Sequence, residues 1–446
     1  MLRRFAISCM LAVTAVGAHA RTRPHYGGTL HVETVGDAWD RGDGLARRLV
    51  YDGLTQLDAT GDVRPGLAQA WESDNNFHRW QFRLRPAVHF HDGTALTPGI
   101  VEASLNTSCN ADCPWTAVRA VGSSVIFTND SPMPNLPALL AGDPFLISLT
   151  ATTDGKTPGN SIGTGPFQVA GFNNGALTLT ANENCWSGRP FADAIEIRVH
   201  RPVREQWLDL TMGRADVVEV PAEMVRQAQQ AKLSLLTSPP LTLLALQVTD
   251  AGSLASVKLR GAIAAAVDRS ALYNVIFQKQ GAITASLLPQ QLSGYSFLFP
   301  ADRDLNKANE LRGGLTARSL SLGTSGDGVM PLAAQRIALN LHEAGINVQV
   351  VNSPHADLML RELQIPAGSP AAALEQVLRQ SGEDAPILAE SPSTLYEAER
   401  TSLEQKKLIP LLDLPRSFAF GPRVRDLRLR ADGLPDLSDA SLEEAR

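Results

Sequence analysis

The sequence predicts an α/β protein built from two or three domains. The chain has 446 residues, and a single domain usually holds about 100–200. Segments with the alternating apolar pattern of a strand are interleaved along the chain with segments that have the apolar spacing of a helix. An apolar content of 44% with 19% charged residues is typical of a folded protein with a sizeable core.

The first half of the chain is predicted to be rich in strands. Apolar side chains alternate with polar ones at four places, namely residues 28–34, 80–84, 177–179 and 195–199. Residues 45–54 instead have apolar side chains at positions 45, 49, 50 and 54, a spacing that predicts a helix. His91, Asp92 and Gly93 follow the second strand and predict a turn.

The second half alternates helices and strands. Residues 257–267 and 269–277 predict consecutive helices, with Asp268 capping the second and Gly281 just past its end. The remaining expectations are a helix with buried Ala334 and Leu341 that ends at Gly345, a strand at 346–350, loop and short helix at 363–385, a helix whose capping box is Thr394 and Glu397, and a short strand at 408–414.

The amino terminus has the three parts of a secretory signal peptide. Basic residues at Arg3 and Arg4 precede an apolar run over 5–17, and Ala18-His19-Ala20 offers small residues at the cleavage positions. A buried amino-terminal helix is the alternative. Cleavage after residue 20 changes the formal net charge from −6 to −8, because Arg3 and Arg4 are removed. No later apolar stretch reaches about 18 residues, so we expect an exported, periplasmic protein without a transmembrane helix.

The cysteines and the net charge give further expectations about disulfide bonds and binding partners. In an oxidising compartment, Cys109 and Cys113 are expected to form a small-loop disulfide, and Cys185 is expected to be a buried free thiol. Lys and Arg total 40 against 46 Asp and Glu, with no long basic block. This balance argues against nucleic acid as a partner.

A collinear series of short segments carries a family resemblance. The most specific is Trp80-Gln81-Phe82-Arg83-Leu84-Arg85 followed by Val88-His89-Phe90-His91-Asp92-Gly93-Thr94. The other segments, in order, are 27–32, 51–54, 65–71, Gly163-Thr164-Gly165-Pro166-Phe167, 182–188, 212–217, 259–269, the helix before Gly345, and 408–411. Over nearly the whole mature chain, this series resembles the family 5 extracellular solute-binding proteins, the dipeptide, oligopeptide and nickel receptors of ABC importers.

The resemblance implies a two-lobed periplasmic binding protein fold (type II, three-subdomain) with a central cleft and a hinge. We therefore expect the signal peptide at 1–20, lobe I from 21–54, 168–245 and 401–446, subdomain II at 55–167, and lobe III at 246–400. Such lobes close around a ligand by hinge motion.

The resemblance also implies where ligand binds, and one region departs from it. In the family the loop after the first strand faces the cleft, so Trp39, Asp43 and Gly44 are candidate ligand-binding residues, with Phe420 bordering the cleft. Core packing is the alternative for Trp39 and Phe420. Peptide-binding relatives supply aromatic residues and an amine-pairing Asp from a region matching 356–390. This region looks shortened here and contains no Trp, Tyr or Phe. Its only Asp residues are Asp357 and Asp384.

Two other groups of residues resemble functional sites but also have structural explanations. Gly159-Asn160-Ser161-Ile162-Gly163 matches a nucleophile elbow, but Pro158 before it and Gly165-Pro166 after it do not fit the required strand and helix. His89 and His91 share one side of a strand, a spacing that permits a metal site, although the family turn explains His91. We expect no catalytic residue, no metal and no cofactor.

The sequence therefore predicts a periplasmic receptor of an ABC importer that captures a small solute, with short peptides as the favoured class. The expected partners are this ligand and a permease of the inner membrane, and the receptor is expected to be a monomer. An exported binding module that has lost transport and acts as a sensor or scaffold is the second hypothesis. A hydrolase that uses Ser161 is the third.

Overall fold

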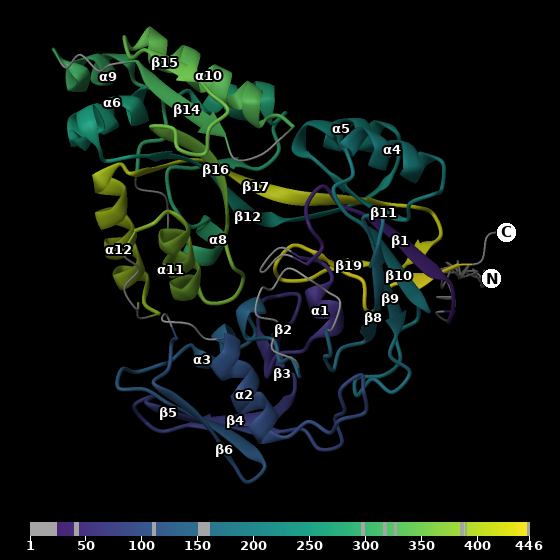
Figure 1. Cartoon of the computed structure of the whole chain (residues 1–446). Helices are drawn as coiled ribbons and strands as arrows, with labels where there is room; N and C mark the ends of the chain where they lie inside the picture. Colours follow the sequence, from purple (N-terminus) through teal and green to yellow (C-terminus); the bar gives the residue numbers. More distant parts are fainter. Residues whose placement is uncertain are drawn as a thin grey trace, which may run out of the picture.

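The computed structural model describes residues 25–39, 44–108, 113–149, 161–295, 299–314, 319–324, 328–383, 388 and 390–443. The predicted signal peptide at 1–20 lies outside these residues. Within them, the protein has the α/β, two-lobed fold that the sequence predicts (Figure 1).

One mixed sheet of eleven strands runs through both lobes. Its order is β15 (Val348–Val350), β14 (Leu320–Thr324), β16 (Leu358–Gln364), β12 (Ser234–Val248), β17 (Leu408–Phe420), β11 (Val217–Val220), β1 (Thr29–Glu33), β10 (Ala194–Arg198), β9 (Ala176–Ala181) and β8 (Phe167–Asn173), with β13 (Ala282–Ile283) paired to β17.

The long strands β12 and β17 connect the two lobes. Ser234 to Thr237 of β12 pair with Ser417 to Phe420 of β17, while β17 also pairs with β11 of lobe I. Beyond Pro240, Thr242 to Gln247 pair with the Leu408–Leu414 half of β17 in lobe III. The register shifts on both sides of Pro240, which faces Pro415. Prolines cannot complete a regular ladder, so they place the irregularity where the strands pass between lobes.

Lobe I buries one face of its sheet. Leu30, Val32, Ile195 and Ile197 alternate inward along β1 and β10 and form one core with Trp39 and others. The short helix α1 (Arg47–Val50) and the terminal strands β18 (Val424–Arg425), β19 (Arg428–Leu429), β20 (Pro435–Asp436) and β21 (Ser441–Leu442) belong to this lobe. Helices α4 (Val203–Thr211) and α5 (Ala222–Gln230) pack beside β11.

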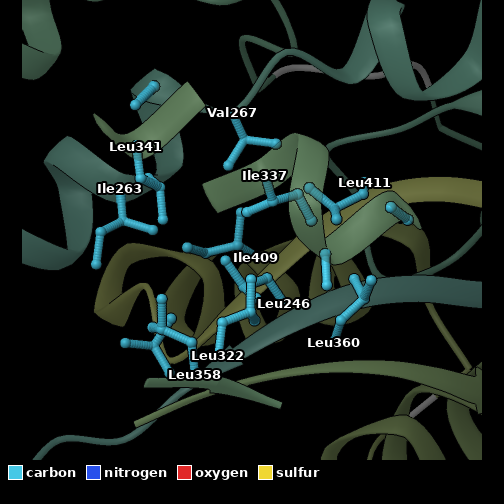
Figure 2. Packing of buried hydrophobic residues seen from close by; sticks show 14 of the residues in the cluster. Leu246, Ile263, Val267, Leu322, Ile337, Leu341, Leu358, Leu360, Ile409 and Leu411 are labelled. Atoms are coloured by element: carbon cyan, nitrogen blue, oxygen red, sulfur yellow. The ribbon is translucent and has the colours of Figure 1, made fainter. Parts of the chain in front are cut away.

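Lobe III has a core on each face of the sheet. On one face, Leu246, Leu322, Leu358 and Ile409 of the strands meet helical residues such as Ile337 (Figure 2). The elements of this side are η3 (Gly252–Ala255), α6 (Val257–Ala266), α7 (Arg269–Ala271), the π-helical turn Leu272–Ile276, α9 (Leu305–Arg312) and α10 (Met330–Glu343). On the other face, Leu243 and Ala245 contact the layer formed by α8 (Gln290–Ser293), α11 (Pro370–Gln380) and α12 (Pro392–Gln405) (Figure 1).

The third part lies below the lobes in Figure 1. Its sheet has the order β4 (Ala68–Ser73), β5 (Arg79–Leu84), β7 (Ser124–Thr128), β6 (Ala117–Val121), and it is accompanied by α2 (Pro98–Ser108), α3 (Leu136–Leu139), η1 (Asp143–Phe145) and the hairpin of β2 (Thr55–Leu57) and β3 (Val63–Pro65). Phe82, Trp115 and Phe127 meet edge to face in its core.

Several local predictions are corrected. The helix expected over 45–54 covers only Arg47–Val50, because Tyr51 turns to extended backbone. Thr394 and Glu397 do not form the capping box; Ser391 caps α12 by accepting from the Thr394 amide. The strand expected at 408–414 continues to Phe420. The predicted division into lobes stays a proposal. β12 continues across the predicted boundary between residues 245 and 246. β17 lies wholly within the predicted 401–446 part of lobe I, yet its Leu408–Leu414 half pairs with Thr242 to Gln247 of β12.

Candidate functional site

The crossing between the lobes is held by side chains as well as by the strands. Thr237 Oγ1 and Ser417 Oγ are hydrogen-bonded at 3.0 Å, and the Arg416 amide donates to Ser238 Oγ at 3.0 Å. The Arg416 guanidinium lies 2.9 Å from Glu219 Oε1 of β11 and stacks over the Phe418 ring. These contacts fix Arg416 on the lobe I side of the crossing, so the irregular stretch around Pro240 is where a hinge motion would bend the sheet.

Trp39 is packed inside lobe I. Its side chain is 2% exposed, and its ring lies edge to face against Tyr51 with centroids 5.9 Å apart. Its backbone amide donates to Asp37 Oδ1 at 2.9 Å. The indole N–H and the Tyr51 hydroxyl are both buried without a hydrogen-bond partner among the described residues. This position favours the packing alternative, and a ligand contact by Trp39 stays a prediction.

The other three predicted ligand-binding residues differ in their surroundings. Asp43 lies outside the described residues, and Gly44, the first described residue after it, is buried. Phe420 is half-buried, paired with Val217 and Ser234 at the lobe I end of β17, and it packs against the lobe I core. The structure thus brings Trp39 and Phe420 to the same core, and the ligand role of all four residues remains a prediction.

The segments that carry the family resemblance meet at one place, which we call the Asp52 junction: Asp52, His91, Thr164 and Trp186 with the backbone of Gly163 and Gly165. Asp52 Oδ2 accepts from Thr164 Oγ1 at 2.7 Å and from the Trp186 indole at 2.8 Å. The His91 ring is hydrogen-bonded to the backbone of both glycines. This junction joins lobe I to the third part, so these motifs build a structural contact.

Burial decides the ionisation of the Asp52 junction. It raises the pKa of the Asp52 carboxyl, although Trp186 and Thr164 donate to it. It also lowers the pKa of His91, against the opposing effects of Gly165 and Asp52. His91 Nδ1 accepts from the Gly163 amide at 3.3 Å, which leaves the proton on Nε2 to donate to the Gly165 carbonyl at 3.0 Å. Both ring nitrogens are therefore occupied.

Ser161 does not form a nucleophile elbow. It is 6% exposed, and the next regular element is strand β8, not a helix. Its hydroxyl is buried with no hydrogen-bond partner among the described residues. The nearby His91 holds its ring nitrogens in contacts with Gly163 and Gly165, so it is not available as a general base.

We expect Ser161→Ala to leave stability unchanged or to raise it by about 1 kcal/mol, because a buried unpaired hydroxyl costs roughly 1–3 kcal/mol. Equilibrium unfolding in urea measures this. Thr164→Ala is the matched control, because its buried hydroxyl donates to Asp52 and its loss should destabilise. A destabilisation by Ser161→Ala as large as that of the control would contradict the assignment of an unpaired hydroxyl.

The shortened region over 356–390 contains regular structure. An eleven-residue helix, α11, lies in the middle of the segment 363–385, which was expected to be loop and short helix. Asp357 is engaged inside lobe III, where its Oδ2 accepts from the amide and hydroxyl of Ser321, each at 2.9 Å. Asp384 lies outside the described residues. Asp357 is thus committed to a structural role.

A buried acidic pair in lobe III was missed by the sequence reasoning. Glu399 of α12 is fully buried and accepts from the amides of Leu287 and Leu288 and from the Tyr295 hydroxyl. Asp413 of β17 is 4% exposed, and its Oδ1 has no hydrogen-bond partner among the described residues. Burial raises the pKa of Glu399 and raises that of Asp413 to about 7. No local sequence signal connects positions 399 and 413.

The remaining polar features lie elsewhere. A surface hollow of about 590 Å³ on lobe I is lined by Asn173, Thr178, Glu196, Arg198 and Arg201, among others, and its arginines are already paired with acidic residues. In the part of the chain that the structure describes, no group of three or more His, Cys, Asp or Glu residues is placed to hold a metal ion. No helix there is long and apolar enough to cross a bilayer.

The cysteine predictions have different outcomes. Cys185 is a buried free thiol, as expected, and burial raises its pKa. Cys113 is disulfide-bonded. Cys109 lies outside the described residues, so its pairing with Cys113 stays a prediction.

The two lobes, the connecting strands and the third part define a protein of the two-lobed solute-binding class. Residues 62–384 match the profile of the bacterial extracellular solute-binding proteins, family 5. The chain belongs to this family.

Curated relatives are distant and are matched only in part. The dipeptide-binding protein of Escherichia coli is 24% identical over 289 residues, covering 55% of this chain and 54% of that protein. The HTH-type transcriptional regulator SgrR of Pectobacterium atrosepticum is 31% identical over 158 residues, or 34% of this chain and 28% of the regulator. The chain thus spans about half of the first relative and under a third of the second.

Solved structures confirm the fold. NikA from Staphylococcus aureus, in complex with Ni(L-His)2, superposes with a TM-score of 0.82 at 15% identity, covering 93% of this chain and 100% of that one. DppA from Helicobacter pylori, in complex with the peptide STSA, gives 0.80 at 17% identity, covering 94% and 99%. At these identities the similarity shows the architecture only.

Proposed function

We propose that this protein is the periplasmic receptor of an ABC importer, which captures a small solute between its lobes and delivers it to a membrane permease. The observation that carries the proposal is the pair of strands β12 and β17, whose register breaks around Pro240 between two separately packed lobes. A ligand that contacts both lobes would shift such a molecule towards its closed arrangement.

Short peptides are the favoured ligand class. The dipeptide-binding protein of Escherichia coli and a probable di/tripeptide-binding protein of Pseudomonas aeruginosa are both similar in sequence, the latter at 25% identity over 346 residues. The missing aromatic residues over 356–390 and the structural commitment of Asp357 argue for an anchor of the ligand's amine that differs from that of peptide-binding relatives.

A thermal-shift screen of residues 21–446 tests the proposal, with di- to pentapeptides, oligosaccharides, nickel and haem as the panel. A ligand present at about 100 times its dissociation constant adds roughly 2.7 kcal/mol of stability, which moves the unfolding midpoint by several degrees. We expect stabilisation by peptides of one length class. Stabilisation by nickel or haem instead would reject the peptide assignment, and no shift from any member would favour a partner-binding module over a transport receptor.

A further inference from the structure

Two arginines of lobe I meet where this lobe, the third part and the crossing strands come together. Arg48 is on α1, and Arg430 follows β19 in the turn that leads to β20. Arg48 Nη2 donates to the Ala141 carbonyl of the third part at 2.8 Å. In the turn after Arg430, a Cβ on Gly433 would lie 2.9 Å from Ser238 Cβ, so this turn packs against β12 beside the crossing. Figure 1 accordingly shows α1 and β19 in the middle of the molecule.

The two guanidiniums share one carboxylate. Arg430 donates to Asp432 Oδ2 at 2.7 Å from Nη2 and to Oδ1 at 3.2 Å from Nε. The Nε atom of Arg48 lies 3.6 Å from Asp432 Oδ2, which is an ion pair but not a hydrogen bond. The only hydrogen bond of the Arg48 side chain to a described residue is the one to Ala141, and Nη1 of Arg430 makes none with these residues. Both arginines therefore keep N–H groups that can bind a further oxyanion.

Neighbouring charges leave this group with an excess of positive charge at close range. Arg47, next to Arg48, pairs with the buried Asp143 at 2.8 Å and so adds no net charge. Asp436 attracts Arg430, but among the described contacts it forms no salt bridge with it. In direct contact, two guanidiniums therefore face a single carboxylate.

The surroundings of the pair favour an anion and allow one to enter. Burial lowers the pKa of Arg48, and so does repulsion from Arg430, while Asp432 opposes both effects. An anion in contact with both guanidiniums would offset this repulsion. The side chains of Arg48, Arg430 and Asp432 are 24%, 17% and 29% exposed, so a small solute can reach them. Because most of their surface is covered by protein, water screens such a contact less than it would at an open surface.

We propose that Arg48 and Arg430 form a carboxylate-binding site beside the crossing, and that the solute captured by this receptor carries a carboxylate. A guanidinium presents N–H groups in a planar fork that matches the two oxygens of a carboxylate. A peptide supplies this group at its carboxyl terminus, and a dicarboxylic acid supplies it at either end. The inference rests on the proposed function, because it concerns the solute that the lobes would capture.

Thermal unfolding of residues 21–446 over a range of probe concentrations tests this site. The probes are succinate and trialanine, which carry carboxylates, and trialanine amide, which has none; sodium chloride keeps the ionic strength constant. We expect both carboxylates to raise the unfolding midpoint. Trialanine should bind at least about tenfold more tightly than its amide, since a hydrogen bond to a charged group is worth at least that factor.

Three substitutions separate a binding role from a structural one. Arg48→Gln and Arg430→Gln should each weaken succinate binding about tenfold or more. Asp432→Asn should strengthen it about fivefold, the factor for one charge at 4 Å in water, because it removes the carboxylate that competes for the two guanidiniums. Arg425→Gln is the control: Arg425 is an exposed partner of Glu443 in the same lobe, and its loss should leave binding unchanged. A cluster with only a structural role would gain affinity in none of these variants.

Melts without probe show whether each variant remains folded, and the gain in Asp432→Asn stays measurable if an arginine variant does not fold. No shift from either carboxylate at about 50 mM would overturn the site. Equal affinity for trialanine and its amide would also overturn it, as would succinate binding that persists unchanged in both arginine variants. A shift from succinate without one from trialanine would support the site and reject peptides as the solute class. Peptides that bind without this site would leave the proposed function standing.

Discussion

Gly163→Ala is expected to destabilise the protein by at least about 3–4 kcal/mol, or to prevent folding at 37 °C. A Cβ at this position would lie 1.9 Å from the Val50 carbonyl oxygen and 2.6 Å from Tyr51 Cδ1. The obstacle is backbone, which cannot rotate away, so the two segments must separate. They are also tied by the Gly165 amide, which donates to the same Val50 oxygen at 3.0 Å.

Urea unfolding of the purified variants measures this effect, with the yield of folded protein as a second readout. Gly99→Ala is the matched control: nothing lies within 4 Å of its Cβ position at the start of α2, so we expect a change of no more than about 1 kcal/mol. If Gly163→Ala unfolds at the same urea concentration as Gly99→Ala, the close approach of the 163–165 segment to α1 does not exist in solution.

The Gly-Thr-Gly-Pro segment could be recognised in the sequence, but its role in packing against Val50 and Tyr51 could not. The glycines and Thr164 form a recognisable local string, so the family resemblance was readable. Their partners Asp52, His91 and Trp186 come from three other segments, and only the folded chain brings them together. The motifs therefore predicted the architecture and said little about the ligand.

Strands were predicted where the local sequence pattern is regular, and they were missed where pairing with distant segments determines the structure. β1, β5 and β10 were predicted because one buried face gives them a period of two. The full length of β17 was missed because Pro410 and Pro415 interrupt the pattern, and pairing with both β11 and β12 overrides them. The helix expected over 45–54 was cut short by the extended backbone at Tyr51, where the 163–165 segment packs against the chain.

The candidate ligand residues were less predictable than the fold, for a physical reason. Trp39 and Phe420 were predicted to border the cleft from the family resemblance, but aromatic side chains suit both ligand stacking and core packing, and the sequence offers no means of separating the two. The structure buries Trp39 at 2% exposure.

Asp413→Asn is expected to make the protein more stable at pH 8 and to remove much of the pH dependence of its stability. The folded-state pKa is about 7, against an ordinary value of 3.8. A carboxyl whose pKa is raised by folding binds more protons in the folded state. Stability is therefore highest below about pH 4, and it falls as the pH rises to 7. The full difference is roughly 4 kcal/mol at 1.36 kcal/mol per pH unit.

The substituted amide keeps an oxygen that can accept from Thr284, the group that hydrogen-bonds to Asp413. It also adds an N–H₂ where the carboxylate has an unpartnered oxygen. Because a buried unpaired donor costs about 1–3 kcal/mol, we expect a net gain of roughly 1–3 kcal/mol at pH 8 and none at pH 5. Urea unfolding at pH 5, 6, 7 and 8 measures the slope for both proteins.

Glu399 also makes the protein less stable as the pH rises, because burial raises the pKa of Glu399 as well. Asp413→Asn leaves this second contribution to the pH dependence in place. The exposed Glu72→Gln on β4 is the control, and we expect it to leave the slope as it is in the parent protein. Equal slopes in Asp413→Asn and the parent protein between pH 5 and 7 would mean that the carboxylate is hydrated in solution. β17 would then be open to water beside the crossing between the lobes, and Asp413 would be available to a cationic ligand.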